Sequence, residues 1–233
     1  MNSRQELDRA TDLLAQASKY IAAIPAQSRA AKLLTIQYEM ESAILGNWKG
    51  SYAESQSHAR KGIAIAEALP PDPADAREAQ YLLARIYDAL AEAVYYGVGA
   101  AESEPVYKRL VAITSTYLTA HPDDALAQRL AIEAHWGLGA TLLGVNRPKD
   151  GLREMQAAAA LVPTLLQYQP EDTGAQRTQR IVYTALAQAL AMSGRFNEGV
   201  ALLREELAKN EELVRKTDSR PEQVRSYGVT LAM

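Results

Sequence analysis

The chain has 233 residues, of which 48% are hydrophobic and only 6% aromatic, with a formal net charge of −3 and no cysteine. The absence of cysteine excludes thiol catalysis, disulfides and cysteine-ligated zinc, and the even spread of Lys and Arg differs from the basic stripe of a nucleic-acid binder. Because the apolar residues are mostly Ala, Leu, Val and Ile and runs of β-branched residues are almost absent, the composition favours an all-α fold.

Breaks in the helical spacing of apolar residues divide the sequence into long helices joined by short turns. In chain order we expect a first helix at 3–24, four antiparallel helix pairs, and a terminal helix at 220–233. The four pairs are expected at 28–69, 74–120, 124–168 and 173–216.

Two kinds of turn alternate along the chain with a period of about 48 residues. Acidic turns with proline recur around Pro73, Pro122, Pro170 and, more loosely, Asp218. Between them lie turns rich in Gly and Asn, which can adopt the left-handed conformation that ends a helix; they occupy 46–50, 97–99, 144–148 and 194–198. Repetition at a fixed period is typical of a helical repeat array, and we expect one array over residues 1–233.

Capping residues and prolines mark the ends of the expected helices. Ser3, Asp75 and Ser219 each precede a Glu by three residues, the spacing of a capping box. Pro163 is expected to kink or split its helix after about Leu161. Pro105 is expected in a first turn, where a missing N–H is tolerated.

The repeated unit resembles the tetratricopeptide repeat. Its best match is His135–Gly139, which is similar to the large-residue and Leu-Gly positions of that family. Asn146 stands at the turn position of the family, Gly151 at the small-residue position and Pro163 at the terminal-proline position. Residues 183–199 resemble the next unit. The family period is 34 residues, so the longer period here implies helices of about 20 residues. Long-period repeats of this kind resemble the helical tails of bacterial signalling proteins such as receptor-like Ser/Thr kinases.

The resemblance implies an all-α, right-handed α-solenoid of antiparallel helix pairs, whose concave groove is lined by the first helix of each pair. With Gly97 taken as the turn residue of the second pair, the groove-facing positions of the family fall on candidate partner-binding residues. These are Tyr87, Tyr95, Glu133, Trp136, Leu143, Thr184, Gln188 and Met192. Trp and Tyr are favoured anchors at interfaces. Packing between the long helices is an equal alternative for Tyr87, Tyr95 and Trp136.

The function implied by the resemblance is a protein–protein interaction or scaffold module. It would bind a peptide or partner helix in the groove, as part of a larger bacterial signalling or regulatory protein. Two alternatives remain open: a small-ligand sensor enclosed by Tyr87, Tyr95 and Trp136, and a scaffold or homo-oligomer that associates through residues 219–233.

No residue pattern supports catalysis. The three His residues lack metal-ligand spacing, and Gly97-Val98-Gly99 lacks the strand–loop–helix context of a phosphate loop. We therefore expect no enzymatic activity, no catalytic residues, no cofactor and no metal.

Apolar stretches and the N-terminal sequence bear on localisation. No stretch approaches the roughly 18 apolar residues of a membrane-spanning helix, and the first residues lack the pattern of a signal peptide. We expect no membrane insertion, no nucleic-acid partner and a cytoplasmic location. An extracytoplasmic domain of a larger membrane-anchored protein is the alternative.

Overall fold

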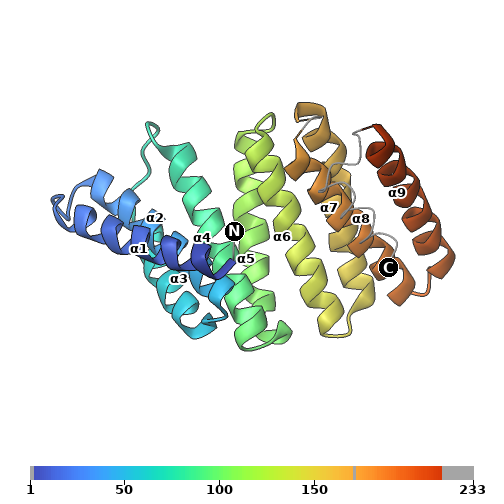
Figure 1. Ribbon diagram of the computed structural model, residues 1–233, viewed down its shortest axis with the longest axis horizontal. Helices are drawn as coiled ribbons and strands as arrows, with labels where there is room; N and C mark the ends of the chain where they lie inside the picture. The colour runs from blue at the N-terminus through green and yellow to red at the C-terminus, as the bar shows by residue number, and fades with distance from the viewer. Residues whose placement is uncertain (1–2, 170–171, 217–233) are drawn as a thin grey trace. The chain divides into compact units, whose positions relative to one another are not determined.

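The structure, a computed structural model, describes residues 3–169 and 172–216 (Figure 1). All regular secondary structure in these ranges is α-helical, as predicted. The helices are Ser3–Ala22 (α1), Arg29–Lys49 (α2), Tyr52–Glu67 (α3), Ala76–Gly97 (α4), Ala100–Ala120 (α5), Ala125–Gly144 (α6), Pro148–Tyr168 (α7), Thr173–Met192 (α8) and Phe196–Lys216 (α9). The limits of the first helix and of the four pairs lie within two residues of the expected ones, and the expected terminal helix at 220–233 lies outside the described residues.

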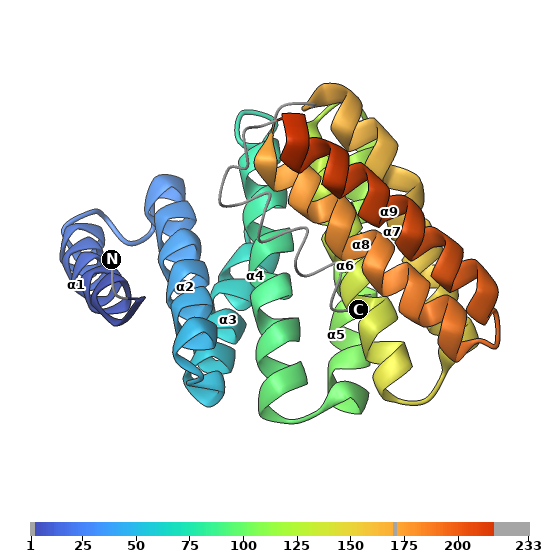
Figure 2. The ribbon, with the colours of Figure 1, turned by 45° about the vertical axis from the view of Figure 1, so that its right-hand side comes forward.

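The helices belong to two compact units, residues 1–120 (unit 1) and 121–233 (unit 2). Unit 1 holds α1 and the pairs α2–α3 and α4–α5, and unit 2 holds the pairs α6–α7 and α8–α9. Within each unit consecutive helices pack together, and the first helices of successive pairs, α2 with α4 and α6 with α8, are also in contact. Figure 2 lets the reader follow α6 to α9 from one helix to the next. Stacked antiparallel pairs of this kind characterise an α-solenoid.

Two small residues meet where the helices of a pair cross. Ser55 on α3 donates its hydroxyl hydrogen to the carbonyl of Ala43 on α2, at 2.8 Å. A Cβ added to Gly199 on α9 would lie 2.6 Å from the carbonyl oxygen of Ala187 on α8. The 48-residue period places buried small residues at the same two positions in all four pairs: Ala43, Ala91, Gly139 and Ala187 on first helices, and Ser55, Ser103, Gly151 and Gly199 on second helices.

The turn inside each pair repeats with the same period. Gly50, Asn146 and Gly194 lie at multiples of 48 residues and have φ values of 73°, 59° and 82°, the left-handed conformation that ends a helix. In the second pair the equivalent residue is Val98, with φ −126°. The register of this pair is therefore set by Val98, one residue later than Gly97, the turn residue expected from the sequence.

A hydrogen-bonded His–Glu pair joins the helices of the first and third pairs. In α2–α3, Nδ1 of His58 lies 2.6 Å from Glu39, and in α6–α7, Nδ1 of His135 lies 2.7 Å from Glu154. Glu39 and His135 are 96 residues apart, as are His58 and Glu154, so the two partners have exchanged places over two periods. This exchange preserves the contact and supports the 48-residue register.

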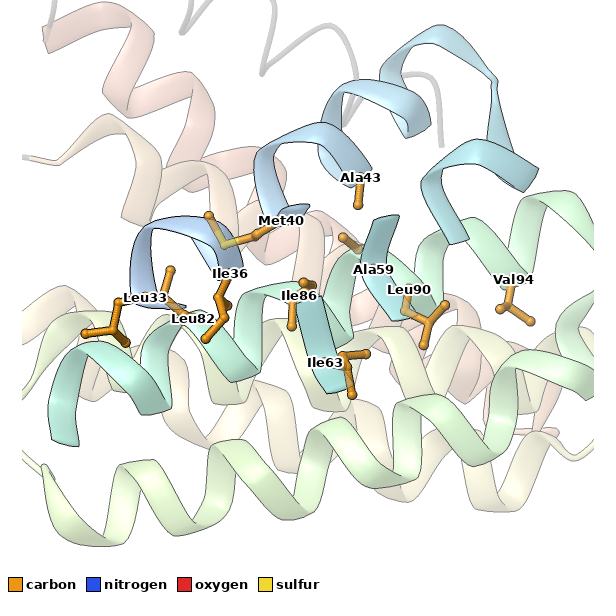
Figure 3. Packing of buried hydrophobic residues seen from close by; sticks show 11 residues of the cluster. Leu33, Ile36, Met40, Ala43, Ala59, Ile63, Leu82, Ile86, Leu90 and Val94 are labelled. Atoms are coloured by element: carbon orange, nitrogen blue, oxygen red, sulfur yellow. The ribbon is translucent and has the colours of Figure 1, made fainter. Parts of the chain in front are cut away.

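The core of unit 1 lies between α2, α3 and α4 (Figure 3). Ile36 and Met40 of α2 belong to the same cluster as Ile63 of α3 and Ile86 of α4. Gly62 leaves room for this packing, because a Cβ there would lie 2.1 Å from Cδ1 of Ile86. Full burial of each large aliphatic side chain contributes about 1.5–3 kcal/mol.

The core of unit 2 consists of two clusters. In one, Ile132 of α6 packs with Val162 of α7 and Val182 of α8. In the other, Met155 of α7 packs with Leu190 of α8. These two clusters hold α6 and α8 against α7.

The structure corrects both expectations about internal prolines. Helix α7 runs unbroken through Pro163, so the break expected after Leu161 does not occur. Pro105 lies in the second turn of α5, because that helix begins at Ala100. Both prolines are exposed. Each proline removes one helix hydrogen bond, and both helices continue in spite of this loss.

Side-chain caps begin three of the first helices. Ser28, Asp124 and Asp172 accept hydrogen bonds from backbone N–H groups at the starts of α2, α6 and α8. The capping box predicted at Asp75 is wrong, because the Asp75 side chain makes no cap hydrogen bond. The one predicted at Ser219 lies outside the described residues.

Arginines hold successive first helices together at their starts. The guanidinium of Arg29 on α2 donates two hydrogen bonds, of 2.5 and 2.6 Å, to the carboxylate of Asp75 before α4. This bidentate pair explains why Asp75 does not cap its own helix. In unit 2, Arg129 on α6 donates to Asp172 before α8. The same device therefore occurs in both units.

We predict that Gly199→Ala destabilises the protein, although Ala is the better helix former by about 1 kcal/mol. The added methyl group has no room against the Ala187 carbonyl, and overpacking of this kind costs about 1–3 kcal/mol. Urea denaturation followed by circular dichroism measures the change. Ala201→Leu, at an exposed position of the same helix, is the control and should change stability by less than about 0.5 kcal/mol. Equal or greater stability of Gly199→Ala would show that the helices do not cross this closely.

We also predict a pH-dependent contribution from Asp172. Hydrogen bonds from the Gly174 N–H and from Arg129 lower the pKa of Asp172. A lowered folded-state pKa stabilises the fold above the unfolded-state value of about 3.9, and this contribution is lost as pH falls through the folded-state pKa. Asp172→Asn retains a capping oxygen but removes the negative charge. The variant should therefore be less stable than the parent at pH 6, and the difference in stability should shrink towards pH 2. Asp12→Asn on the exposed face of α1 serves as the control for thermal melts across this range, and a pH-independent difference for Asp172→Asn would contradict the assignment.

Candidate binding surface

The structure distributes the predicted partner-binding residues over both units. Tyr87 and Tyr95 lie on α4 in unit 1, whereas the other six lie on α6 and α8 in unit 2. Because α6 and α8 are in contact, the six residues of unit 2 belong to neighbouring helices. Glu133 among them is half-buried.

In unit 2, exposure separates surface residues from packed ones. Trp136 and Met192 are 36% and 52% exposed, and Gln188 is also exposed. Thr184 is buried, and Leu143 packs into the cluster between α7 and α8. Trp136, Gln188 and Met192 are therefore the accessible candidates of unit 2, and their part in partner binding stays a prediction.

In unit 1, Tyr87 lies among the helices. Its hydroxyl donates to Oε1 of Glu67 on α3 at 2.8 Å, and Arg109 on α5 lies 3.5 Å from the same carboxylate oxygen. Burial and the hydrogen bond to Glu67 raise the pKa of Tyr87. These contacts match the packing alternative for this residue. In the 48-residue register, the residue equivalent to Trp136 is Asp88.

Asp88 begins a stripe of side chains along α4. Asp88, Glu92, Tyr95 and Tyr96 recur at the spacing that places residues on one face of a helix. Tyr95 is half-buried and Tyr96 is 63% exposed. The two rings meet edge to face, with centroids 5.1 Å apart, and Tyr96 also stacks on Tyr52 of α3 at 5.8 Å.

Asn47 on α2 connects the neighbouring first helix to this stripe. Its Nδ2 donates to the carbonyl of Ala89 at 2.9 Å and to Oε2 of Glu92 at 3.2 Å. The side-chain oxygen of Asn47 is buried and accepts no hydrogen bond. An unpaired buried polar atom of this kind costs about 1–3 kcal/mol. Below, Asn47, Asp88, Glu92, Tyr95 and Tyr96 are called the acidic–aromatic cluster.

Two carboxylates give the acidic–aromatic cluster a net negative charge. Burial raises the pKa of Asp88, although the positive charge of Arg85, 3.0 Å away, acts to lower it. Partial burial and the charge of Asp88 raise the pKa of Glu92, against the hydrogen bond from Asn47. Among the described residues Glu92 forms no ion pair, although its side chain is exposed. The charge of Arg85 lowers the pKa of Glu92 as well as that of Asp88.

The repeat register of the sequence contains a signal for this cluster. Asn47 and Tyr95 precede Leu143 by two periods and one period, respectively. Aligning the second pair on Gly97 moved the register by one residue and selected Tyr87 instead of Asp88. Periodicity alone does not show that Asn47 bonds to Glu92, because that contact joins two helices.

Metal sites and membrane-spanning helices can be assessed over residues 3–169 and 172–216. No group of three or more His, Asp or Glu side chains there is placed to hold a metal ion. No helix in the same ranges is long and apolar enough to cross a membrane.

Comparison with known proteins gives the fold. No protein-family model matches this sequence, and no curated protein sequence matches it. The apo form of RapI, a tetratricopeptide-like helical repeat protein, matches the structure with a TM-score of 0.68 at 10% identity, over 99% of this chain and 78% of RapI. At this identity the match shows the fold alone. The predicted helical repeat fold is confirmed, and the resemblance to bacterial kinase tails stays a prediction.

We predict that Glu92→Gln makes the protein more stable at pH 7. A carboxyl group whose folded-state pKa is raised destabilises the fold as pH rises from the unfolded-state value, about 4.3, through the folded-state value. Gln removes the charge and keeps an oxygen that can accept from Asn47. The melting temperature of the variant should exceed that of the parent at pH 7 and approach it below pH 4. Glu54→Gln, at an exposed position of α3, should leave the melting temperature unchanged, and a lower melting temperature for Glu92→Gln would contradict the prediction.

Proposed function

We propose that this chain is a non-enzymatic protein-interaction module that binds a peptide segment or helix of a partner on the exposed faces of its first helices. The observation that carries the proposal is the exposure of large side chains on these helices. Trp48, Tyr96, Trp136 and Met192 are 76%, 63%, 36% and 52% exposed, on α2, α4, α6 and α8.

The 48-residue register supports this assignment. Trp48, Tyr96 and Met192 occupy one position of the repeat in three different pairs. Isolated apolar residues on a surface are ordinary, but here large exposed side chains recur at one repeat position of the first helices in both units. Solenoids bind extended or helical segments on their first helices, and aromatic residues are strong anchors because they bury much area at low entropic cost.

The biological setting is a further part of the proposal. A module of this kind fits within a larger regulatory or signalling protein of bacteria, in keeping with the resemblance of its long-period repeats to the tails of such proteins. Of the two alternatives, self-association through residues 219–233 concerns a segment outside the described residues. For a small-ligand sensor, Tyr87 offers little, because its hydroxyl is already bonded to Glu67.

Selection from a random displayed-peptide library against the full chain tests the proposed function. We expect peptides with micromolar affinity, and we expect their affinity to fall at least about tenfold, or 1.4 kcal/mol, on the double variant Tyr96→Ala, Trp136→Ala. Both substituted residues are accessible, so the variant should remain folded, as circular dichroism would verify.

Phe196→Ala is the matched control for this selection. Phe196 is 65% exposed but begins a second helix, α9, so its loss should not weaken binding. The proposed function fails if the library yields no binder, or if the selected peptides bind the double variant as well as they bind the parent.

A further inference from the structure

Three tyrosine rings meet where α3 begins and α4 ends, and Tyr52, Tyr95 and Tyr96 are called the tyrosine cluster below. The Tyr96 ring contacts both of the others. It stacks on Tyr52 with centroids 5.8 Å apart and planes 23° from parallel, and it meets Tyr95 edge to face at 5.1 Å. Tyr96 is 63% exposed, whereas Tyr52 and Tyr95 are half-buried. The cluster therefore offers partly accessible ring surface from two helices at one place.

The helices approach closely enough to fix these rings. A Cβ added to Gly97 of α4 would lie 2.6 Å from the Cβ of Tyr52 on α3, so Gly97 leaves the space in which Tyr52 lies against α4. Contacts with Tyr52 and Tyr95 then restrain the exposed Tyr96 ring. A ring that is held in place before a ligand arrives loses less entropy on binding.

The hydroxyl groups of the tyrosine cluster make no hydrogen bond with any other residue that the structure describes. Other tyrosines differ in this respect, because the hydroxyls of Tyr87 and Tyr168 donate to carboxylates. A tyrosine hydroxyl carries one donor hydrogen. The cluster thus combines apolar ring surface with donor hydrogens that a ligand can use.

We propose that the tyrosine cluster binds a proline-rich segment of the partner in the polyproline II conformation. The inference rests on the proposed function and adds the class of segment that is bound. It combines two observations: three rings fixed by mutual contacts, and hydroxyl donors that have no protein acceptor among the described residues.

Hydrogen bonding favours polyproline II over a helix as the bound conformation. The carbonyl groups in the middle of a helix accept hydrogen bonds from the helix itself. A polyproline II segment has no internal hydrogen bonds, so its carbonyls are free to accept from tyrosine hydroxyls. Proline also has no backbone N–H, so the segment brings no donor that would need an acceptor on the protein.

Ring packing favours the same ligand. Proline-rich segments bind on surfaces lined by aromatic side chains, where the pyrrolidine rings pack against the aromatic rings. The polyproline II conformation exists before binding, so little entropy is lost in forming it. A preformed segment and a preformed tyrosine cluster fit this mode of recognition.

The chain has exposed prolines of its own, which makes a second copy the rival occupant. Pro70, Pro71 and Pro73 lie in the segment between α3 and α4. Arg29 of α2 donates to the Pro70 carbonyl at 2.6 Å and also to Asp75. The Pro70 carbonyl already accepts a hydrogen bond, and the segment is fastened to α2. We therefore assign the cluster to a segment of another protein.

Nuclear magnetic resonance of the full, ¹⁵N-labelled chain tests the inference with two defined probes. The first is acetylated and amidated hexaproline made of L-proline. The second is its mirror image made of D-proline, which has the same composition and the opposite helical hand. We expect L-hexaproline to shift the backbone amides of residues 52–56 and 95–99, with a Kd of about 1 mM or lower. D-hexaproline should bind at least about tenfold more weakly.

Substitutions at Tyr96 separate the ring from its hydroxyl. Tyr96→Ala removes both and should weaken L-hexaproline binding at least about tenfold, whereas Tyr96→Phe keeps the ring and should weaken binding several-fold. Tyr20→Ala is the matched control, because Tyr20 is a 75% exposed tyrosine on α1 of the same unit. This variant should bind like the parent, and circular dichroism verifies that all three variants are folded.

The outcomes separate this inference from the proposed function. Equal binding of the two hexaprolines, no shift at the tyrosine cluster, or unchanged binding by Tyr96→Ala or Tyr96→Phe overturns the inference. Self-association of the parent that Tyr96→Ala abolishes also overturns it, because a second copy would then occupy the cluster.

Selection from the peptide library decides the proposed function independently. If the selected peptides depend on Tyr96 and Trp136 but are not enriched in proline, and L-hexaproline does not bind, the proposed function stands and the inference fails. If the library yields no binder, the proposed function fails, whereas shifts that L-hexaproline alone causes at residues 52–56 and 95–99 would still support a proline-binding site.

Discussion

The close crossing of two helices at a pair of small residues is the constraint on which the rest of this fold depends. Where a Cβ on one helix would lie 2.6 Å from the carbonyl of the other, as at Gly199, a larger residue forces the helices apart. Because the crossing recurs every 48 residues, it determines how each second helix lies on its first helix. The direction of every other side chain follows from that register, since residues of a helix have fixed angular positions around its axis.

The first helix α4 is consequently packed on one side and exposed on part of another. The core clusters hold α4 through Leu82, Ile86 and Leu90, whereas Asp88, Glu92 and Tyr96 lie on other faces of the same helix. The contacts between Arg29 and Asp75, and between Arg129 and Asp172, fasten neighbouring first helices at their starts. The surface that they present is thus built on rigid elements, which suits a binding site that has to be formed before its ligand arrives.

The acidic–aromatic cluster breaks rules that the rest of unit 1 obeys. Like charges stand one turn apart at Asp88 and Glu92, and Asn47 buries an acceptor without a donor. Both features destabilise a folded chain. Local features that reduce stability without an evident structural gain are typical of functional sites.

Local sequence determined the helices. Apolar spacing, Gly and Asn turns and acidic proline turns act over a few residues, so helix limits and the 48-residue period could be read from them, and a helical repeat fold followed. The prolines were less predictable, because packing of α7 against its neighbours outweighs the hydrogen bond that Pro163 removes from it. The site depended on tertiary structure. Contacts between helices decide whether Tyr87 packs or is exposed, whether Asp75 caps its helix or binds Arg29, and whether Asn47 reaches Glu92. A shift of one residue in register is enough to change which side chains are in contact.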